Sequence, residues 1–221
     1  LRSDRYFVMR CVQETSGALR YASEKLLHDR DFILSVIRVR GYALYCVPHF
    51  RHDRDVVMCA VKSHGLALGY ASQELRSDRE IVMNAVMQHG LALRYASKEL
   101  QNDEQVVMNA VMQHGTALAH ASDELRNEER VVMIAVKNDL NSFMHASHSL
   151  RNNVDFMLRC IQEAGADFLV AKHSWGSGRL TPLKWRDDFD FMVRAVKLNS
   201  ECLQYASDRL KRLPEFRKAV E

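Results

Sequence analysis

Apolar residues recur along the chain with a helical spacing. In the segment 104–115, for example, Val106, Val107, Ala110 and Val111 stand at i, i+1, i+4 and i+5, which places them on one stripe of a helix. In most copies of this pattern a glycine follows, and then a second apolar run of the type A-L-x-Y-A-S. Glycine tolerates the left-handed conformation that ends many helices. The pattern therefore predicts a helix, a turn and a second, shorter helix.

The same pattern is repeated in tandem over nearly the whole chain. The segments 75–99 and 100–124 are copies of one unit of 25 residues. The units start near Leu1, Leu26, Phe50, Leu75, Leu100, Leu125, Leu150 and Trp185. Neither helix is long enough to be stable alone in water, whereas stacked units bury a continuous core. We therefore expect an all-α fold, an α-solenoid of about eight 25-residue helix-turn-helix repeats, as a single elongated domain over 1–221, right-handed by analogy with other helical repeats.

Polar residues mark both ends of the first helix of a unit. Ser77 with Glu80, and Asn102 with Gln105, have the spacing of a capping box, so we expect the helix to start there. A histidine precedes the glycine in three units, where a partial positive charge would favour the C-terminal carbonyls. These histidines are His64, His89 and His114.

The run D-R-E-I-V-M-N-A-V-M-Q-H-G-L-A-L-R-Y-A-S-K-E-L, from Asp78 to Leu100, resembles the short tandem repeat of the domain of unknown function numbered 4116. The resemblance extends over about residues 1–172 and again over 185–210. That family occurs in bacterial effector-type proteins and in protist and algal proteins, without an established activity, cofactor or ligand. The resemblance implies a helical interaction array and no particular chemistry.

The largest departure from the repeat is an insertion at 173–184, between the seventh and eighth units. It contains Trp175, Arg179 and Lys184. Insertions in solenoids map to loops that often lie on the binding face, and tryptophan with arginine is typical of interface anchors. We expect a protruding loop that contacts a partner. The alternative is a tolerated insertion without a function of its own.

One column in the middle of the first helix varies from unit to unit. It reads Arg10, Ser35, Cys59, Asn84, Asn109, Ile134, Arg159 and Arg194. Within it we expect partner contacts from Asn84, Asn109 and Arg159. Helical repeats that read RNA place two or three variable polar residues per unit against each base. The column shows no such paired code, so RNA binding is kept only as a minor alternative.

Two columns of arginine accompany the helix starts. The first contains Arg2, Arg51, Arg76, Arg126, Arg151 and Arg186, and the second contains Arg5, Arg30, Arg54 and Arg79. Such columns could form a basic ladder for an acidic partner. Because each arginine neighbours an Asp or Glu of the same or the next unit, we prefer ion pairs within the chain, on a solvated edge.

Composition and motifs give little support for catalysis. The 221 residues carry a net charge of +3, which is too small to indicate nucleic-acid binding by itself. The sequence contains no H-E-x-x-H, Cys-x-x-Cys, phosphate-binding loop or G-x-S-x-G. We expect no catalytic residue, cofactor, metal or small-molecule substrate. No apolar run is long enough to span a membrane. The five cysteines lack paired spacing, which suits a reducing compartment such as the cytoplasm or an organelle interior.

The sequence therefore predicts a non-catalytic protein–protein interaction scaffold, an accessory or structural subunit of a larger multiprotein assembly. The alternative is a repeat module of a bacterial effector-type protein that binds a host protein. Because the chain begins with Leu1 rather than Met, we expect a fragment or a processed product.

Overall fold

The computed structural model describes residues 1–169 and 183–221, and the side chains of 1–169 and 185–221. The described residues form helices and no strand, as an all-α solenoid requires. They fall into two compact units, Leu1–Ser122 and Asp123–Glu221, which are described separately here. The expectation of a single elongated domain, and the hand of the solenoid, stay predictions.

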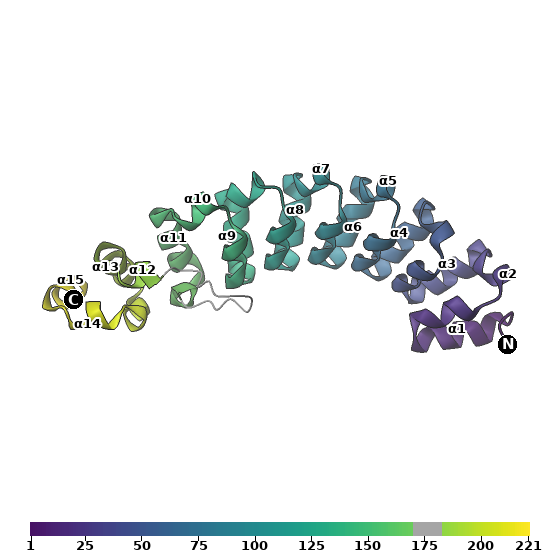
Figure 1. Cartoon of the computed structure of the whole chain (residues 1–221), viewed down its shortest axis with the longest axis horizontal. Coiled ribbons are helices and arrows are strands. Elements are labelled where there is room, and N and C mark those ends of the chain that lie inside the picture. The colour runs from purple at the N-terminus through teal and green to yellow at the C-terminus, as the bar shows by residue number, and fades with distance from the viewer. Residues whose placement is uncertain (170–182) are drawn as a thin grey trace. The chain divides into compact units, whose positions relative to one another are not determined.

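Each repeat of the first unit contributes one long α-helix. These are α1 (Arg5–Glu14), α3 (Arg30–Val39), α4 (Arg54–Ser63), α6 (Arg79–Gln88) and α8 (Glu104–Gln113). Consecutive long helices pack side by side (Figure 1), and the four stripe positions of α4, α6 and α8 are fully buried. The repeat register and the predicted core stripe are thereby confirmed.

The start of each long helix differs from the capping box predicted from the sequence. The N-cap is the aspartate itself: Asp78 accepts hydrogen bonds from the backbone N–H groups of Glu80 and Ile81, at 2.9 and 3.1 Å. Ser77 lies before the cap and donates its hydroxyl to the carbonyl of Gln73. The capping-box interpretation was wrong because a carboxylate one position later reaches the same orphan N–H groups and also suits the helix dipole.

The second predicted helix divides into two elements. A 3-10 helix comes first, as η1 (Ser16–Tyr21), η2 (Gly41–Cys46), η4 (Gly65–Tyr70), η5 (Gly90–Tyr95) and η6 (Gly115–His120). Then follows a single short turn, as α2 (Glu24–Leu27), η3 (Pro48–Phe50), α5 (Gln73–Arg76) or α7 (Lys98–Gln101). The hydroxyls of Ser72 and Ser97 cap α5 and α7, and the N–H of Ser97 also donates to the carbonyl of Arg76 at 3.0 Å. That bond joins the end of the repeat to its beginning.

The glycine column has a different role from the one expected. Among the described residues only Gly165 has a positive φ, of 94°. At Gly41, Gly65 and Gly90 the backbone instead meets the next long helix so closely that a Cβ atom would lie 2.2–2.4 Å from a carbonyl oxygen. Glycine is required there because neighbouring repeats approach backbone to backbone, not because the chain turns left-handed.

The second unit repeats the plan with larger side chains in its core. Its long helices are α9 (Glu129–Asn138), α11 (Val154–Ala164) and α13 (Phe189–Leu198), and its 3-10 helices are η7 (Leu125–Asn127), η8 (Leu140–His145), η9 (Ala166–Leu169) and η10 (Ser200–Tyr205). The short helices are α10 (His148–Arg151), α12 (Leu183–Arg186), α14 (Asp208–Arg212) and the terminal α15 (Pro214–Val220). Phe143 packs edge-on against Phe168 at 4.8 Å. Although the insertion lies between them in sequence, α11 and α13 still pack against each other.

Candidate interaction surface

The arginines of the second column form an ion-pair ladder along one edge of the first unit. Arg30 binds Asp53 and Asp55, each at 2.7 Å, and Arg79 binds Asp103 at 3.0 Å. The ladder contains the contacts of Arg5 with Asp29, of Arg30 with Asp53 and Asp55, of Arg54 with Asp78 and Glu80, and of Arg79 with Asp103. Ion pairing within the chain, as predicted for this column, is confirmed. Four of these aspartates cap their own helix and also bind the arginine of the preceding repeat: Asp29, Asp53, Asp78 and Asp103.

The arginines of the first column bind backbone instead. Arg2, Arg126 and Arg186 each donate Nε to the carbonyl of the residue nineteen positions later, at 2.6 Å. Arg76 donates to the carbonyls of Ala71 and Gly69. Arg126 also forms the expected ion pair, with Asp123 at 3.2 Å. For Arg2, Arg76 and Arg186, carbonyl contacts take the place of the expected ion pairs.

Two of the predicted partner contacts lie on adjacent helices. Asn84 is on α6 and Asn109 is on α8, and both are half-buried. Each side-chain amide donates at 2.8 Å to a carbonyl of its own helix, that of Glu80 or Gln105. The structure thus brings the two residues together, but with one amide donor of each already engaged.

The third predicted partner contact, Arg159, belongs to the second unit. It is exposed on α11 and pairs with Glu129 of α9. Arg194, in the same column, pairs with Asp155 at 2.6 Å. Both arginines border a cavity of about 440 Å³ between α11 and α13, which Leu158 and Leu198 also line. Trp175 and Arg179 lie outside the described residues, and of Lys184 only the backbone is described, in α12.

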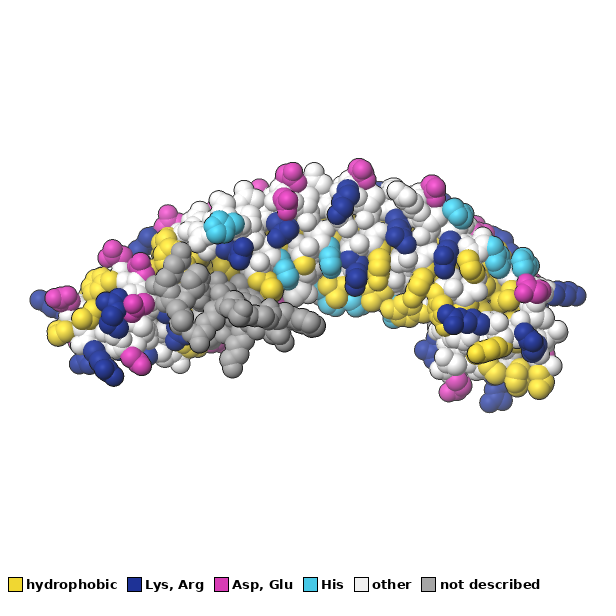
Figure 2. Space-filling view, in the orientation of Figure 1, with side chains coloured by type: hydrophobic (Ala, Val, Ile, Leu, Met, Phe, Trp, Pro, Cys, Tyr) yellow, Lys and Arg dark blue, Asp and Glu magenta, His cyan; other side chains and the backbone are white. Residues whose placement is uncertain are grey.

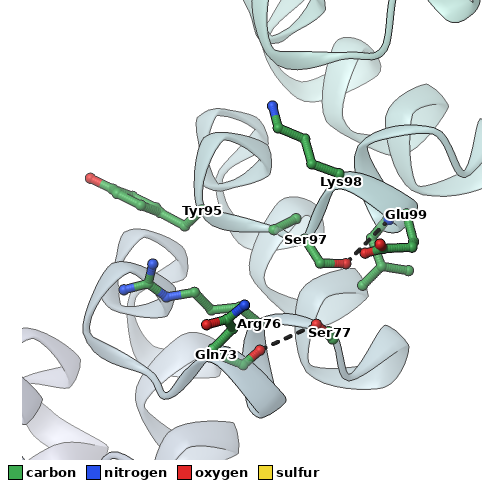
Figure 3. A pocket seen from close by; sticks show the side chains of 9 residues that line it. Gln73, Arg76, Ser77, Tyr95, Ser97, Lys98 and Glu99 are labelled. Atoms are coloured by element: carbon green, nitrogen blue, oxygen red, sulfur yellow. Dashed lines mark hydrogen bonds between the residues drawn. The ribbon is translucent and has the colours of Figure 1, made fainter.

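A second cavity, of about 700 Å³, lies in the first unit, where α5 meets the end of η5 and α7. Arg76, Tyr95 and Lys98 line it (Figure 3). Its two cations do not converge: Lys98 points away from Arg76 and donates to the side chain of Gln101 at 3.0 Å. Because Arg76 is also engaged, by backbone carbonyls, this cavity presents no free cation pair to a ligand.

The edge opposite the ladder has a different composition, which sequence reasoning missed. Here α3, α4, α6 and α8 end and η2, η4, η5 and η6 begin, and the four segments 35–46, 59–70, 84–95 and 109–120 contain no Asp or Glu. We call these four segments the acid-free edge. They contain the basic residues Arg38, Arg40, Lys62 and Arg94, together with four histidines. Figure 2 shows acidic side chains over α5 and α7, and hydrophobic and histidine side chains gathered below α4 and α6.

Two methionines stand out on the acid-free edge. Met87 is 57% exposed and Met112 is 59% exposed, at equivalent positions of the adjacent helices α6 and α8. In the six other repeats the same position holds a polar residue: Gln13, Arg38, Lys62, Lys137, Gln162 or Lys197. Aligning the repeats on this exposed position would have found the two methionines from the sequence alone. Exposed methionine is common on adaptable binding surfaces.

Histidines stack along the same edge. The rings of His89 and His114 lie parallel with centroids 4.2 Å apart, and His64 lies 4.0 Å from Tyr42. The N–H of Gly90 donates to Nδ1 of His114 at 3.2 Å, which requires that nitrogen to be unprotonated. Burial, and then the nearby His89, lower the pKa values of His64 and His114. The prediction of a partial positive charge at these helix ends is therefore wrong for His114, because its neutral ring accepts a hydrogen bond.

Aromatic rings continue the edge onto the 3-10 helices. The ring of Tyr45 lies 5.7 Å from that of Tyr70, and the guanidinium of Arg20 lies 4.5 Å above Tyr45. Arg94 lies 5.1 Å from the ring of Tyr95, which is itself half-buried. These tyrosines pack between repeats and are half-buried, so each keeps one side near solvent.

The described residues contain no group of three His, Cys, Asp or Glu side chains that could hold a metal ion. All five cysteines are free thiols, and burial raises the pKa of Cys160 to about 12. In the part of the chain that the structure describes, no helix is both long and apolar enough to cross a membrane.

The sequence profile of one family, described as a domain of unknown function (DUF4116), matches the chain repeatedly. The matches cover residues 4–51, 36–76, 53–101, 78–126, 128–169 and 180–211. They follow the repeats seen in the structure. No curated protein and no solved structure matches the chain.

Proposed function

Because the chain belongs to the DUF4116 family, whose function is unknown, we propose from its own surface that it is a non-catalytic protein–protein interaction scaffold. It would serve as an accessory or structural subunit of a larger assembly. The observation that carries this proposal is the pair of exposed methionines on adjacent helices, Met87 and Met112. Their position in the repeat needs only a polar residue for folding, as the other six copies show.

Polar residues around the methionines suit a protein partner. Asn84 and Asn109 stand one helical turn before Met87 and Met112, and Gln88 and Gln113 directly follow them. An apolar centre with an uncharged polar border resembles the composition of a protein–protein interface core and its rim. The ladder carboxylates lie at the other end of the same helices, where Arg30, Arg54 and Arg79 already bind them.

Site-specific photo-crosslinking tests this proposal. A benzophenone amino acid replaces Met87 or Met112 in the full chain, and the matched control carries it at the exposed Glu99 of α7. We expect positions 87 and 112 to crosslink to the same protein in an extract of the source organism, and position 99 not to. Equal crosslinking from all three positions, or none from 87 and 112, would contradict the proposed surface.

The native size of the protein in that extract separates a stable subunit from a transient binder. Elution with the crosslinked partner in one large complex supports the accessory-subunit role. Elution near the mass of the chain or of a longer parent, with crosslinks still formed, would favour a module that binds transiently, such as an effector-type module.

A further inference from the structure

Resting on the proposed interaction role, we propose that the acid-free edge of the first unit binds a segment of a partner protein. One half of this segment is acidic and the other half is apolar. One exposed column on this edge carries the argument. From α3 to α8 it reads Arg38, Lys62, Met87 and Met112, and all four side chains are exposed. Two cations are thus followed by two apolar side chains, in the order in which the helices stack.

The two cations are free to meet an anion. In the described part of the chain, neither Arg38 nor Lys62 is in ion-pair contact with a carboxylate. On α4, the nearest acidic residue toward the start of the helix is Asp55, seven residues before Lys62 and therefore about 10 Å away along the axis. Asp55 is itself bound by Arg30. An acidic partner would neutralise charges that the fold leaves uncompensated.

The groups beside the column are uncharged. At the next position along each helix stand Val39, Ser63, Gln88 and Gln113, of which Val39 is 49% exposed. The helix turn before holds Ser35, Cys59, Asn84 and Asn109. No group on these positions repels an anion or binds the cations, so the column can select a partner by charge at one end and by apolar contact at the other.

The spacing sets the length of the occupant. Packed helices lie about 8–10 Å apart, so three steps from α3 to α8 span about 27 Å. An extended peptide rises about 3.3 Å per residue and covers this distance with about eight residues. Nucleic acid fits the surface less well, because phosphates would meet cations in only half of the column and the methionines would face the charged backbone.

Fluorescence anisotropy on the full chain tests the proposal. The probe is a labelled peptide of about ten residues, with glutamates in its first half and leucine and phenylalanine in its second. We expect Lys62→Glu to weaken its binding about tenfold, and Met112→Gln to weaken it as well. A peptide with lysines in place of the glutamates should bind Lys62→Glu better than it binds the unmodified chain.

Lys98→Glu is the matched control, because Lys98 is an exposed lysine of the same unit on the opposite edge. Circular dichroism checks that each variant is folded. Equal weakening by Lys98→Glu, no effect of Lys62→Glu, or competition by single-stranded oligouridine at least as strong as that by unlabelled peptide would overturn the proposal. If the peptide fails while positions 87 and 112 still crosslink a protein, the interaction role stands and only the acidic partner is refuted. If neither peptide binding nor crosslinking is observed, both the acidic partner and the interaction role are refuted.

Discussion

The close backbone approach at Gly90 gives the sharpest test of how the repeats are held together. A Cβ atom added there would lie 2.2 Å from the carbonyl oxygen of Ala110 and 3.1 Å from the backbone N of His114. Both are backbone atoms of the next repeat, so no rotamer change relieves the clash. Ordinary contact requires a separation of about 3.5 Å, so η5 and α8 must move apart by roughly 1 Å.

We therefore expect Gly90→Ala to destabilise the first unit by about 1–3 kcal/mol, the usual cost of overpacking. Alanine also restricts the unfolded chain, which offsets about 0.4–1 kcal/mol because Gly90 does not have a positive φ. The shift also weakens the hydrogen bond from the N–H of Gly90 to His114.

Gly69→Ala is the matched control. There the three atoms nearest to a Cβ atom all belong to the ring of Tyr95, at 2.9–3.2 Å, and that ring is half-buried and can rotate. We expect a cost below about 1 kcal/mol. Urea unfolding followed by circular dichroism gives the stabilities, and amide hydrogen exchange shows whether the loss is centred on η5 and α8. If Gly69→Ala costs as much as Gly90→Ala, or if Gly90→Ala is as stable as the original chain, backbone contact is not what requires glycine.

Three further predictions concern titratable groups. Lowering the pH from about 7.5 to 5.5 should destabilise the first unit, because the pKa of His114 is lower in the folded state than in the unfolded chain. The contribution of His114 to stability is complete above about pH 6.5 and falls below that value as the unfolded chain takes up the proton. His114→Gln, whose amide oxygen can accept the N–H of Gly90, should flatten this pH dependence in urea titrations. At lower pH, the hydrogen bond from Arg30 lowers the pKa of Asp53, so its contribution is present above about pH 3.9 and is lost as the pH falls below that value; Asp53→Asn should therefore be less sensitive to acid in thermal melts. Because burial raises the pKa of Cys160 to about 12, maleimide labelling at pH 8 followed by mass spectrometry should modify this thiol only after urea unfolding, and rapid native labelling would refute its burial.

The repeat could be derived from sequence because its apolar columns encode both helix and stacking. The buried positions Val106, Val107, Ala110 and Val111 were readable from their spacing, and so was their contact with the next copy. The conformation of the A-L-x-Y-A-S run could not be predicted, because its apolar spacing is compatible with either an α-helix or a 3-10 helix. What decides is the short connection to the repeat start, where the N–H of Ser97 bonds the carbonyl of Arg76.

The candidate surface was harder to predict, because a side chain's availability depends on its neighbours in space. Arg159 was a reasonable anchor by residue type, yet Glu129, thirty residues earlier, binds it on the adjacent helix. The side-chain amide of Asn84 is likewise engaged, because it donates to the carbonyl of Glu80 in its own helix. Met87 and Met112 are exposed because of their position in the repeat, which holds a polar residue in the other six copies.

Helix electrostatics offer a simpler origin for the acid-free edge. Carboxylates are unfavourable in the last turn of a helix, where the dipole is negative, so their absence there could reflect stability alone. The other repeats of this chain argue against that explanation. Glu14 ends α1, Glu163 lies in the last turn of α11, and Asp139 is the C-cap of α9. The fold tolerates acid at these positions in three repeats and lacks it in four consecutive ones, and the dipole gives no reason for the methionines that two of those four repeats expose. A surface kept free of acid for a partner accounts for both.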